Sequence, residues 1–166
     1  MKVLLVDDEP FILQGLSVLI DWAAEGCEIV KMASNGKEAL LYLEDHEADL
    51  VITDIKMPVM SGLELLEQIR GRQISDAFFI ILSGYNDFSY AQKAIRYACM
   101  DYLVKPVQKE ALLELIRKAK SSLAVTEQNA ENERRMQEMQ LKQYIIAAWG
   151  WRLTLHSYQY AEYFGY

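Results

Sequence analysis

Short apolar runs alternate with longer amphipathic segments, and this alternation most constrains what the chain can fold into. The apolar runs cover residues 2–6, 28–34, 50–54, 78–83 and 101–106, and they are short enough to be strands. Apolar residues recur at helical spacing over residues 10–24, 36–45, 61–71, 87–98 and 108–124. Strands that alternate with helices pair in parallel through right-handed crossovers. The pattern predicts an α/β fold, a doubly wound five-stranded parallel sheet with helices on both faces.

Composition narrows the class of protein. The chain has 166 residues and a formal net charge of −7, which argues against nonspecific binding of nucleic acid. Cys27 and Cys99 belong to no paired motif, so they are expected to be small buried hydrophobes rather than zinc ligands or a disulfide. The apolar run before Asp7 is too short for a signal peptide, and no stretch is long enough for a membrane span. We therefore expect a cytoplasmic protein with no membrane contact.

Acids follow two of the predicted strands. Asp7 and Asp8 come directly after the first strand, and Asp54 ends the third. Ser83 ends the fourth strand and Lys105 the fifth. Ligands of open parallel sheets bind at the carboxyl ends of the strands. With a strand order of 2-1-3-4-5 the first and third strands are neighbours, and the three acids share one pocket.

Three carboxylates in one pocket repel each other unless a cation neutralises them. Ligation by oxygen atoms suits Mg²⁺. Lys105 adds a positive charge and Ser83 a hydroxyl donor. The set predicts a site for a phosphoryl group, whose charge the metal and the lysine would neutralise.

The motifs that carry these residues resemble those of a known family. "VDDEP", "TDIKMPVMSGLEL", "ILSGYND" and "YLVKPV" occur in the order and spacing of response-regulator receiver domains of two-component signalling. The resemblance covers residues 2 to about 120. Two further segments resemble receivers of AraC-type transcription regulators: "LIDWAAEGCEIV" and "SGYNDFSYAQKAI". The family's fold is flavodoxin-like, with strand order 2-1-3-4-5.

The resemblance also implies roles for single residues. Asp54 is similar to the phospho-acceptor, which takes a phosphoryl group from a sensor histidine kinase. Asp8 resembles the direct Mg²⁺ ligand, Asp7 a ligand acting partly through water, and the backbone carbonyl of Lys56 a further ligand. Ser83 and Tyr102 resemble the switch pair, and Lys105 the lysine that pairs with the phosphoryl group. The Lys105–Pro106 peptide bond is expected to be cis.

The resemblance further implies that phosphorylation changes a surface at which a partner binds. Phosphorylation adds charge and acceptor oxygens at Asp54. The change would pass through Ser83 and Tyr102 to the face of the fourth and fifth helices, which is also a possible homodimer surface. The output would be transcription control, with DNA bound only through an output region missing from this chain. The alternative is a stand-alone receiver that acts through protein contacts alone.

Two other classes of function compete with a receiver. Hydrolases with an aspartate nucleophile and Mg²⁺ usually carry a general acid two residues after the nucleophile, and Lys56 occupies that position here. A pseudo-receiver would lack the acceptor or the metal acids, which this chain has. We therefore expect no enzyme beyond the chain's own phosphoryl transfer and dephosphorylation.

The character of the chain changes after the predicted fifth helix. We expect a receiver domain at 1–122, a helical linker at 123–143 and an aromatic-rich tail at 144–166, with the output domain absent or truncated. A heptad pattern that starts at Ile116 fails at Gln137, which gives little support for a coiled coil. The tail lacks a clear amphipathic period, so we expect it to be disordered or to pack on a neighbouring chain.

Overall fold

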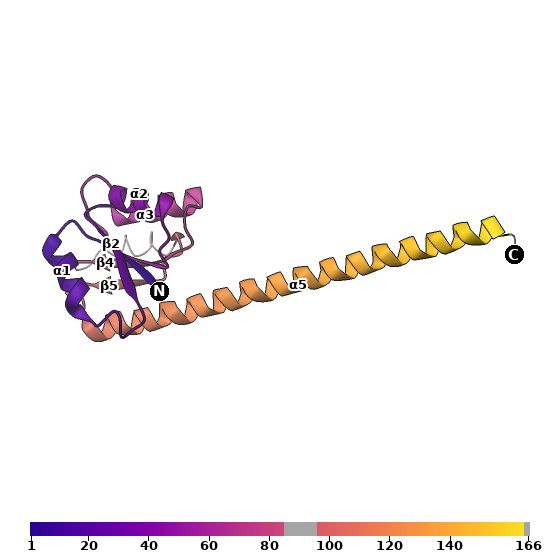
Figure 1. Cartoon of the computed structure of the whole chain (residues 1–166). Coiled ribbons are helices and arrows are strands. Elements are labelled where there is room, and N and C mark those ends of the chain that lie inside the picture. Colours follow the sequence, from indigo (N-terminus) through magenta and orange to yellow (C-terminus); the bar gives the residue numbers. More distant parts are fainter. Residues whose placement is uncertain (85–95, 165–166) are drawn as a thin grey trace. The chain divides into compact units, whose positions relative to one another are not determined.

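The computed structural model describes the backbone of residues 1–84 and 96–164, and the side chains of residues 1–84 and 96–144 (Figure 1). The chain divides into two compact units, Met1–Leu123 and Ala124–Tyr166, which are treated separately here.

The first unit is built on a five-stranded parallel sheet in the order β2-β1-β3-β4-β5. The strands are β1 (Lys2–Val6), β2 (Glu28–Ala33), β3 (Leu50–Asp54), β4 (Phe78–Ser83) and β5 (Asp101–Val104). Val6 pairs with Thr53, so β1 and β3 end side by side. The predicted fold class and strand order are confirmed.

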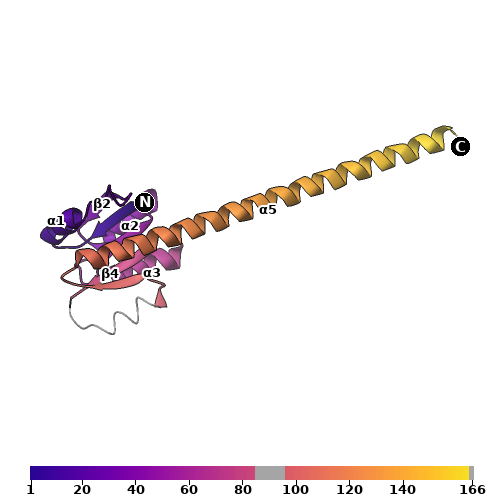
Figure 2. The ribbon, with the colours of Figure 1, turned by 90° about the horizontal axis from the view of Figure 1, so that it is seen from below.

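Helices cover both faces of the sheet (Figure 1). The described helices are α1 (Pro10–Leu19), α2 (Gly36–Asp45), α3 (Gly62–Arg72) and α5 (Lys109–Phe164). Apolar residues of α1 and of the first turns of α5 pack on one face, against β1, β3 and β4 (Figure 2). Residues of α2 and α3 pack on the other face. Successive side chains of a strand point to opposite faces, and so Leu4 and Leu5 enter different clusters.

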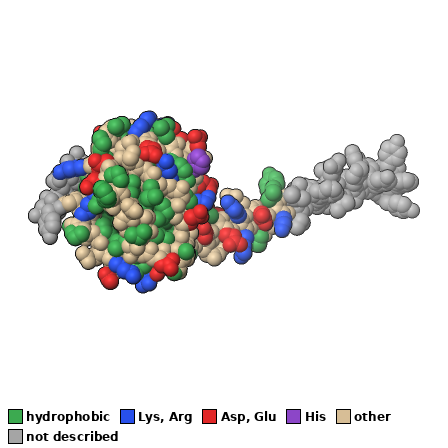
Figure 3. Space-filling view, turned by 60° about the vertical axis from the view of Figure 1, so that its left-hand side comes forward, with side chains coloured by type: hydrophobic (Ala, Val, Ile, Leu, Met, Phe, Trp, Pro, Cys, Tyr) green, Lys and Arg blue, Asp and Glu red, His purple; other side chains and the backbone are tan. Residues whose placement is uncertain are grey.

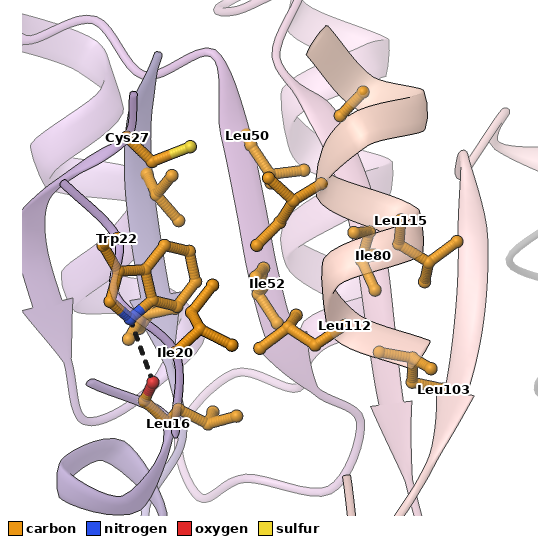
Figure 4. Close-up of a cluster of buried hydrophobic side chains, with 14 of the residues drawn as sticks. Leu16, Ile20, Trp22, Cys27, Leu50, Ile52, Ile80, Leu103, Leu112 and Leu115 are labelled. Carbon is orange, nitrogen blue, oxygen red and sulfur yellow. Dashed lines mark hydrogen bonds between the residues drawn. The ribbon is translucent and has the colours of Figure 1, made fainter. Parts of the chain in front are cut away.

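The predicted first helix was wrong at its end, because α1 stops at Leu19 rather than at residue 24. Ile20 takes an extended backbone, and Asp21 accepts a hydrogen bond from the N–H of Ala24 to form a turn. The turn buries Trp22, whose indole N–H donates to the carbonyl of Leu16 at 3.1 Å (Figure 4). Burying this large ring in the core favours the turn over further helix.

Other boundaries differ from prediction by smaller amounts. The fifth strand ends at Val104 instead of residue 106, because Pro106 has no N–H for the ladder. Side chains cap two of the helices at their N-termini: Asn35 accepts from the N–H of Glu38 in α2, and Ser61 forms a capping box with Glu64 in α3. The predicted helix 87–98 falls mostly on residues 85–95, outside the described residues, as does its share of the expected dimer face.

The second unit is a helix. Its backbone continues α5 through Phe164, so the first alternative for the tail, disorder, was wrong over residues 144–164. The second alternative, packing on a neighbouring chain, stays a prediction. Every residue from 124 to 144 is exposed. Within the described residues no helix has the length and apolar character to cross a membrane.

Candidate functional site

The carboxyl ends of β1, β3 and β5 bring two acids and a lysine together. The ammonium of Lys105 donates to Asp7 Oδ2 and contacts Asp54 Oδ1, and each distance is 2.7 Å. The two carboxylate oxygens therefore lie within twice that distance of each other. Asp7 is fully buried, and the side chain of Asp54 is 11% exposed. The structure thus confirms the prediction that Asp7, Asp54 and Lys105 lie together.

The bridge changes the acid–base behaviour of Lys105. Burial lowers the pKa of its ammonium, but the hydrogen bonds to Asp54 and Asp7 outweigh burial and raise that pKa. Lys105 therefore stays charged at neutral pH. The Lys105–Pro106 peptide bond is cis, as expected.

Backbone groups hold the two carboxylates in place. The N–H of Glu9 donates to Asp7 Oδ1, and the N–H of Lys56 donates to Asp54 Oδ2, both at 2.9 Å. The buried hydroxyl of Thr53 donates to the carbonyl oxygen of Asp54 at 3.0 Å. Each carboxylate is therefore held both by one backbone N–H and by the ammonium of Lys105.

Asp8 occupies a different environment from Asp7. It is exposed, and it lines a hollow of about 480 Å³ with Ile55, Lys56, Met57, Pro58, Ser61 and Leu63. Asp8 and Lys56 thus border the same space beside Asp54. The hollow therefore lies at the carboxyl end of β3, where Ile55 and Lys56 directly follow Asp54 in the sequence.

A divalent cation fits this site by donor chemistry, although its ligands are not preassembled. Among the described residues, no three of His, Cys, Asp or Glu are grouped as a metal site, so the expected three-acid cluster is not formed. The physical reason is that Lys105 lies between Asp7 and Asp54, while Asp8 faces the hollow. Three carboxylates against one ammonium leave an excess of negative charge, and oxygen donors suit Mg²⁺.

Of the predicted switch residues, Ser83 ends β4 at this edge of the sheet, and Tyr102 lies within β5, where it pairs with Ile81. Ser83 is 4% exposed, and its hydroxyl donates to the carbonyl of Gly84 at 2.7 Å rather than to Asp54. Tyr102 is half-buried against the cluster of Ile55, Leu63 and Ile81. The hydroxyl of Ser83 is therefore engaged with the backbone beside it.

Sequence reasoning missed three contributors to the site. Glu9 acts through its backbone N–H, which gives no signal in a side-chain pattern. Thr53 looked like one more β-branched residue of a buried strand, and Ser61 like a helix cap alone. The position near a strand end could have marked Glu9 and Thr53, but Ser61 lies seven residues beyond the end of β3 and had no such signal.

The chain matches a known protein family. The model of the response regulator receiver domain family matches residues 3–117. The chain belongs to this receiver family. The receiver is 39% identical over 112 residues to the "Uncharacterized transcriptional regulatory protein YesN" of Bacillus subtilis, a match that covers 68% of this chain and 30% of YesN.

Solved structures place the receiver in the same family. It is similar to the REC domain of AraT, a response regulator from Geobacillus stearothermophilus, with a TM-score of 0.70 and 39% identity over 76% of this chain and 97% of that one. It is also similar to a chain of the CheX–CheY–BeF3–Mg complex from Borrelia burgdorferi, with a TM-score of 0.62, 28% identity and coverage of 69% and 84%. The receiver chain spans less than half the length of the curated relatives it matches, 30–46% for three of them.

Proposed function

We propose that Asp54 accepts a phosphoryl group from a sensor histidine kinase and that phosphorylation switches an output. The observation that carries this proposal is the bridge from Lys105 to both Asp7 and Asp54 at 2.7 Å. It puts a fixed positive charge where a phosphoryl group on Asp54 would carry negative charge.

The reaction is a displacement at phosphorus. A carboxylate oxygen of Asp54 forms the new O–P bond while the P–N bond to the kinase histidine breaks, and the imidazole leaves with the electron pair. Asp7, Asp8, Asp54 and the Lys56 carbonyl would hold Mg²⁺, which supplies charge neutralisation at the phosphoryl oxygens. Apart from this transfer and its own dephosphorylation, the chain would not act as an enzyme.

The switch would begin at Ser83. Its hydroxyl now donates to Gly84, and a phosphoryl oxygen within reach would be a stronger, charged acceptor. Turning toward Asp54 would move the end of β4, and a rotamer change of the half-buried Tyr102 would pass this movement to the surface. The output we propose is transcription control, by analogy with the relative YesN, with any contact to DNA made outside these residues.

A small phosphodonor tests the proposal without knowledge of the kinase. The full chain is incubated with acetyl phosphate and Mg²⁺, and the intact protein is weighed by mass spectrometry. We expect one added phosphoryl group in the wild type, none in Asp54→Asn, and a large reduction in Asp8→Asn or without Mg²⁺. An equal mass gain in Asp54→Asn would contradict the assignment of the acceptor, and no gain in the wild type would contradict the proposed function.

A further inference from the structure

The second unit leaves a long helix without packing. From 124 to 144 every residue is exposed, while the backbone stays helical through Phe164. Helices in proteins gain most of their stability by packing an amphipathic face rather than from the helix propensity of their residues. A helix of this length therefore calls for a partner.

Charged residues of this helix gather on one side. An α-helix has 3.6 residues per turn. On this basis, six charged residues share one side of the helix that covers about a third of its circumference: Glu127, Glu131, Arg134, Arg135, Glu138 and Lys142. A second side, which we call the seam, carries no charge and contains Val125, Asn129, Asn132, Met136, Met139 and Gln143, while the seventh charge, Glu133, lies outside both sides. Figure 3 shows charged and hydrophobic side chains along this part of the helix.

The seam has the spacing of a coiled coil. Its six residues follow one another at alternating steps of four and three, as the a and d positions of a heptad do. Val125, Met136 and Met139 are 60%, 59% and 60% exposed, so apolar surface is open to a partner along it. The heptad that starts at Ile116 fails because it follows a different stripe, through Leu123 and Ala130.

We propose that the seam is a dimer interface, at which a second copy of this chain packs in parallel and in register as a two-stranded coiled coil. The segment suits its own copy because its charges nearly cancel. Four glutamates stand against Arg134, Arg135 and Lys142 between 124 and 144, so two copies approach without strong repulsion.

The seam asparagines favour an identical partner. The amide of Asn129 or Asn132 has both donors and an acceptor, so two identical amides facing each other satisfy one another. A buried Asn at such a position sets parallel register at a cost in stability. Arg135 pairs with Glu131 of the same helix at 2.5 Å, so this flanking charge is already compensated within each chain. The dimer is thus specific but weak, and it does not require phosphorylation.

Sedimentation of the full, unphosphorylated chain over a concentration series tests the dimer. The double variant Met136→Glu and Met139→Glu puts two acids on the seam, and Arg134→Glu makes the same change in net charge on the charged side. We expect a reversible monomer–dimer equilibrium in the wild type and in Arg134→Glu, and at least a tenfold weaker one in the double variant. A wild type that stays monomeric throughout, or equal weakening by Arg134→Glu, would overturn the proposal.

Cysteine cross-linking tests the orientation. In a Cys99→Ser background, which retains the buried Cys27 and serves as the blank, single cysteines replace Val125, Asn132 or Met139 on the seam. We expect each to form a disulfide-linked dimer on mild oxidation, and Glu138→Cys on the charged side to form far less. Cross-linking at only one of the three seam positions would show an antiparallel crossing and contradict the proposal, as would equal cross-linking at Glu138.

Discussion

Gly62 lies against Asp54, so closely that a β-carbon added to Gly62 would be 2.1 Å from the carbonyl oxygen of Asp54. The N–H of Gly62 also donates to the carbonyl of Ile55 at 3.0 Å. The first residue of α3 is therefore packed directly on the backbone that carries the proposed acceptor.

Replacing Gly62 with alanine is expected to lower the free energy of unfolding by about 1–3 kcal/mol, because backbone rather than a flexible side chain would have to move. Urea denaturation measures the change. Gly71, in the same helix, has no atom within 4 Å of an added β-carbon. Gly71→Ala is therefore expected to be neutral or to stabilise by up to about 1 kcal/mol. Equal effects of the two substitutions would contradict the packing argument.

Lys105→Met is expected to leave the fully buried Asp7 without its cation. Removing one partner of a buried ion pair costs about 3 kcal/mol, the low end of the usual range, because the side chain of Lys105 is 20% exposed. Thermal unfolding of the unphosphorylated protein reports the loss. The control is Lys118→Met, because Lys118 pairs with Asp101 at 2.6 Å but is 53% exposed, and it is expected to change stability little. A similar loss in both variants would count against a special role for the bridge.

Glu38 gives the fold a dependence on acid pH. The hydrogen bond from Lys31 and the N–H of Ser34 lower the pKa of Glu38 from 4.5 to about 2. A carboxyl with a lowered pKa stabilises the folded state fully above its unfolded value and loses that contribution as the pH falls toward the folded value. Wild type and Glu38→Gln are therefore expected to differ most above about pH 5 and to converge only as the pH falls to about 2, the folded pKa of Glu38.

Chemical denaturation at several pH values measures this convergence. Glu47→Gln is the matched control, because the side chain of Glu47 is 89% exposed beside Lys2. It is expected to follow the wild type at every pH. A difference between wild type and Glu38→Gln that stays constant down to the lowest pH would show that the ion pair with Lys31 does not supply the effect.

Ser83→Ala separates the resting fold from the switch. In the resting state the hydroxyl of Ser83 donates to the carbonyl of Gly84, and the loss of this bond is expected to cost about 1 kcal/mol. Beryllofluoride with Mg²⁺, which imitates the phosphoryl group, is expected to raise the melting temperature of Ser83→Ala less than that of the wild type. Ser121→Ala removes a hydroxyl that bonds the Arg117 carbonyl of α5, and it is expected to respond as the wild type does. An undiminished shift in Ser83→Ala would argue against the switch role.

The strands and their order could be predicted because the information is local and repeated. Residues 50–54 form a continuous apolar run that ends in Asp54, and β3 has those bounds. The end of α1 could not be predicted, because helical spacing continues past Leu19 and only the tertiary burial of Trp22 stops it.

The site was predictable in its members but not in its arrangement. The motifs brought Asp7, Asp54 and Lys105 to one edge, and the contacts at 2.7 Å bear this out. That Lys105 would bridge the two acids while Asp8 faces the hollow depends on side-chain conformations, which no spacing encodes. The backbone donors of Glu9 and Lys56 are likewise invisible in a list of side chains.

The bridge between Lys105 and Asp7 joins residues 98 positions apart. During translation both acids leave the ribosome long before the lysine does. A nascent chain that stops short of β5 would have to bury the carboxylate of Asp7 without the ammonium of Lys105. In the folded chain it is this ammonium that offsets the free-energy cost of the burial. We therefore expect closure of the sheet around these acids to wait for the last strand, and fragments that lack β5 to fail as miniature versions of the proposed acceptor site.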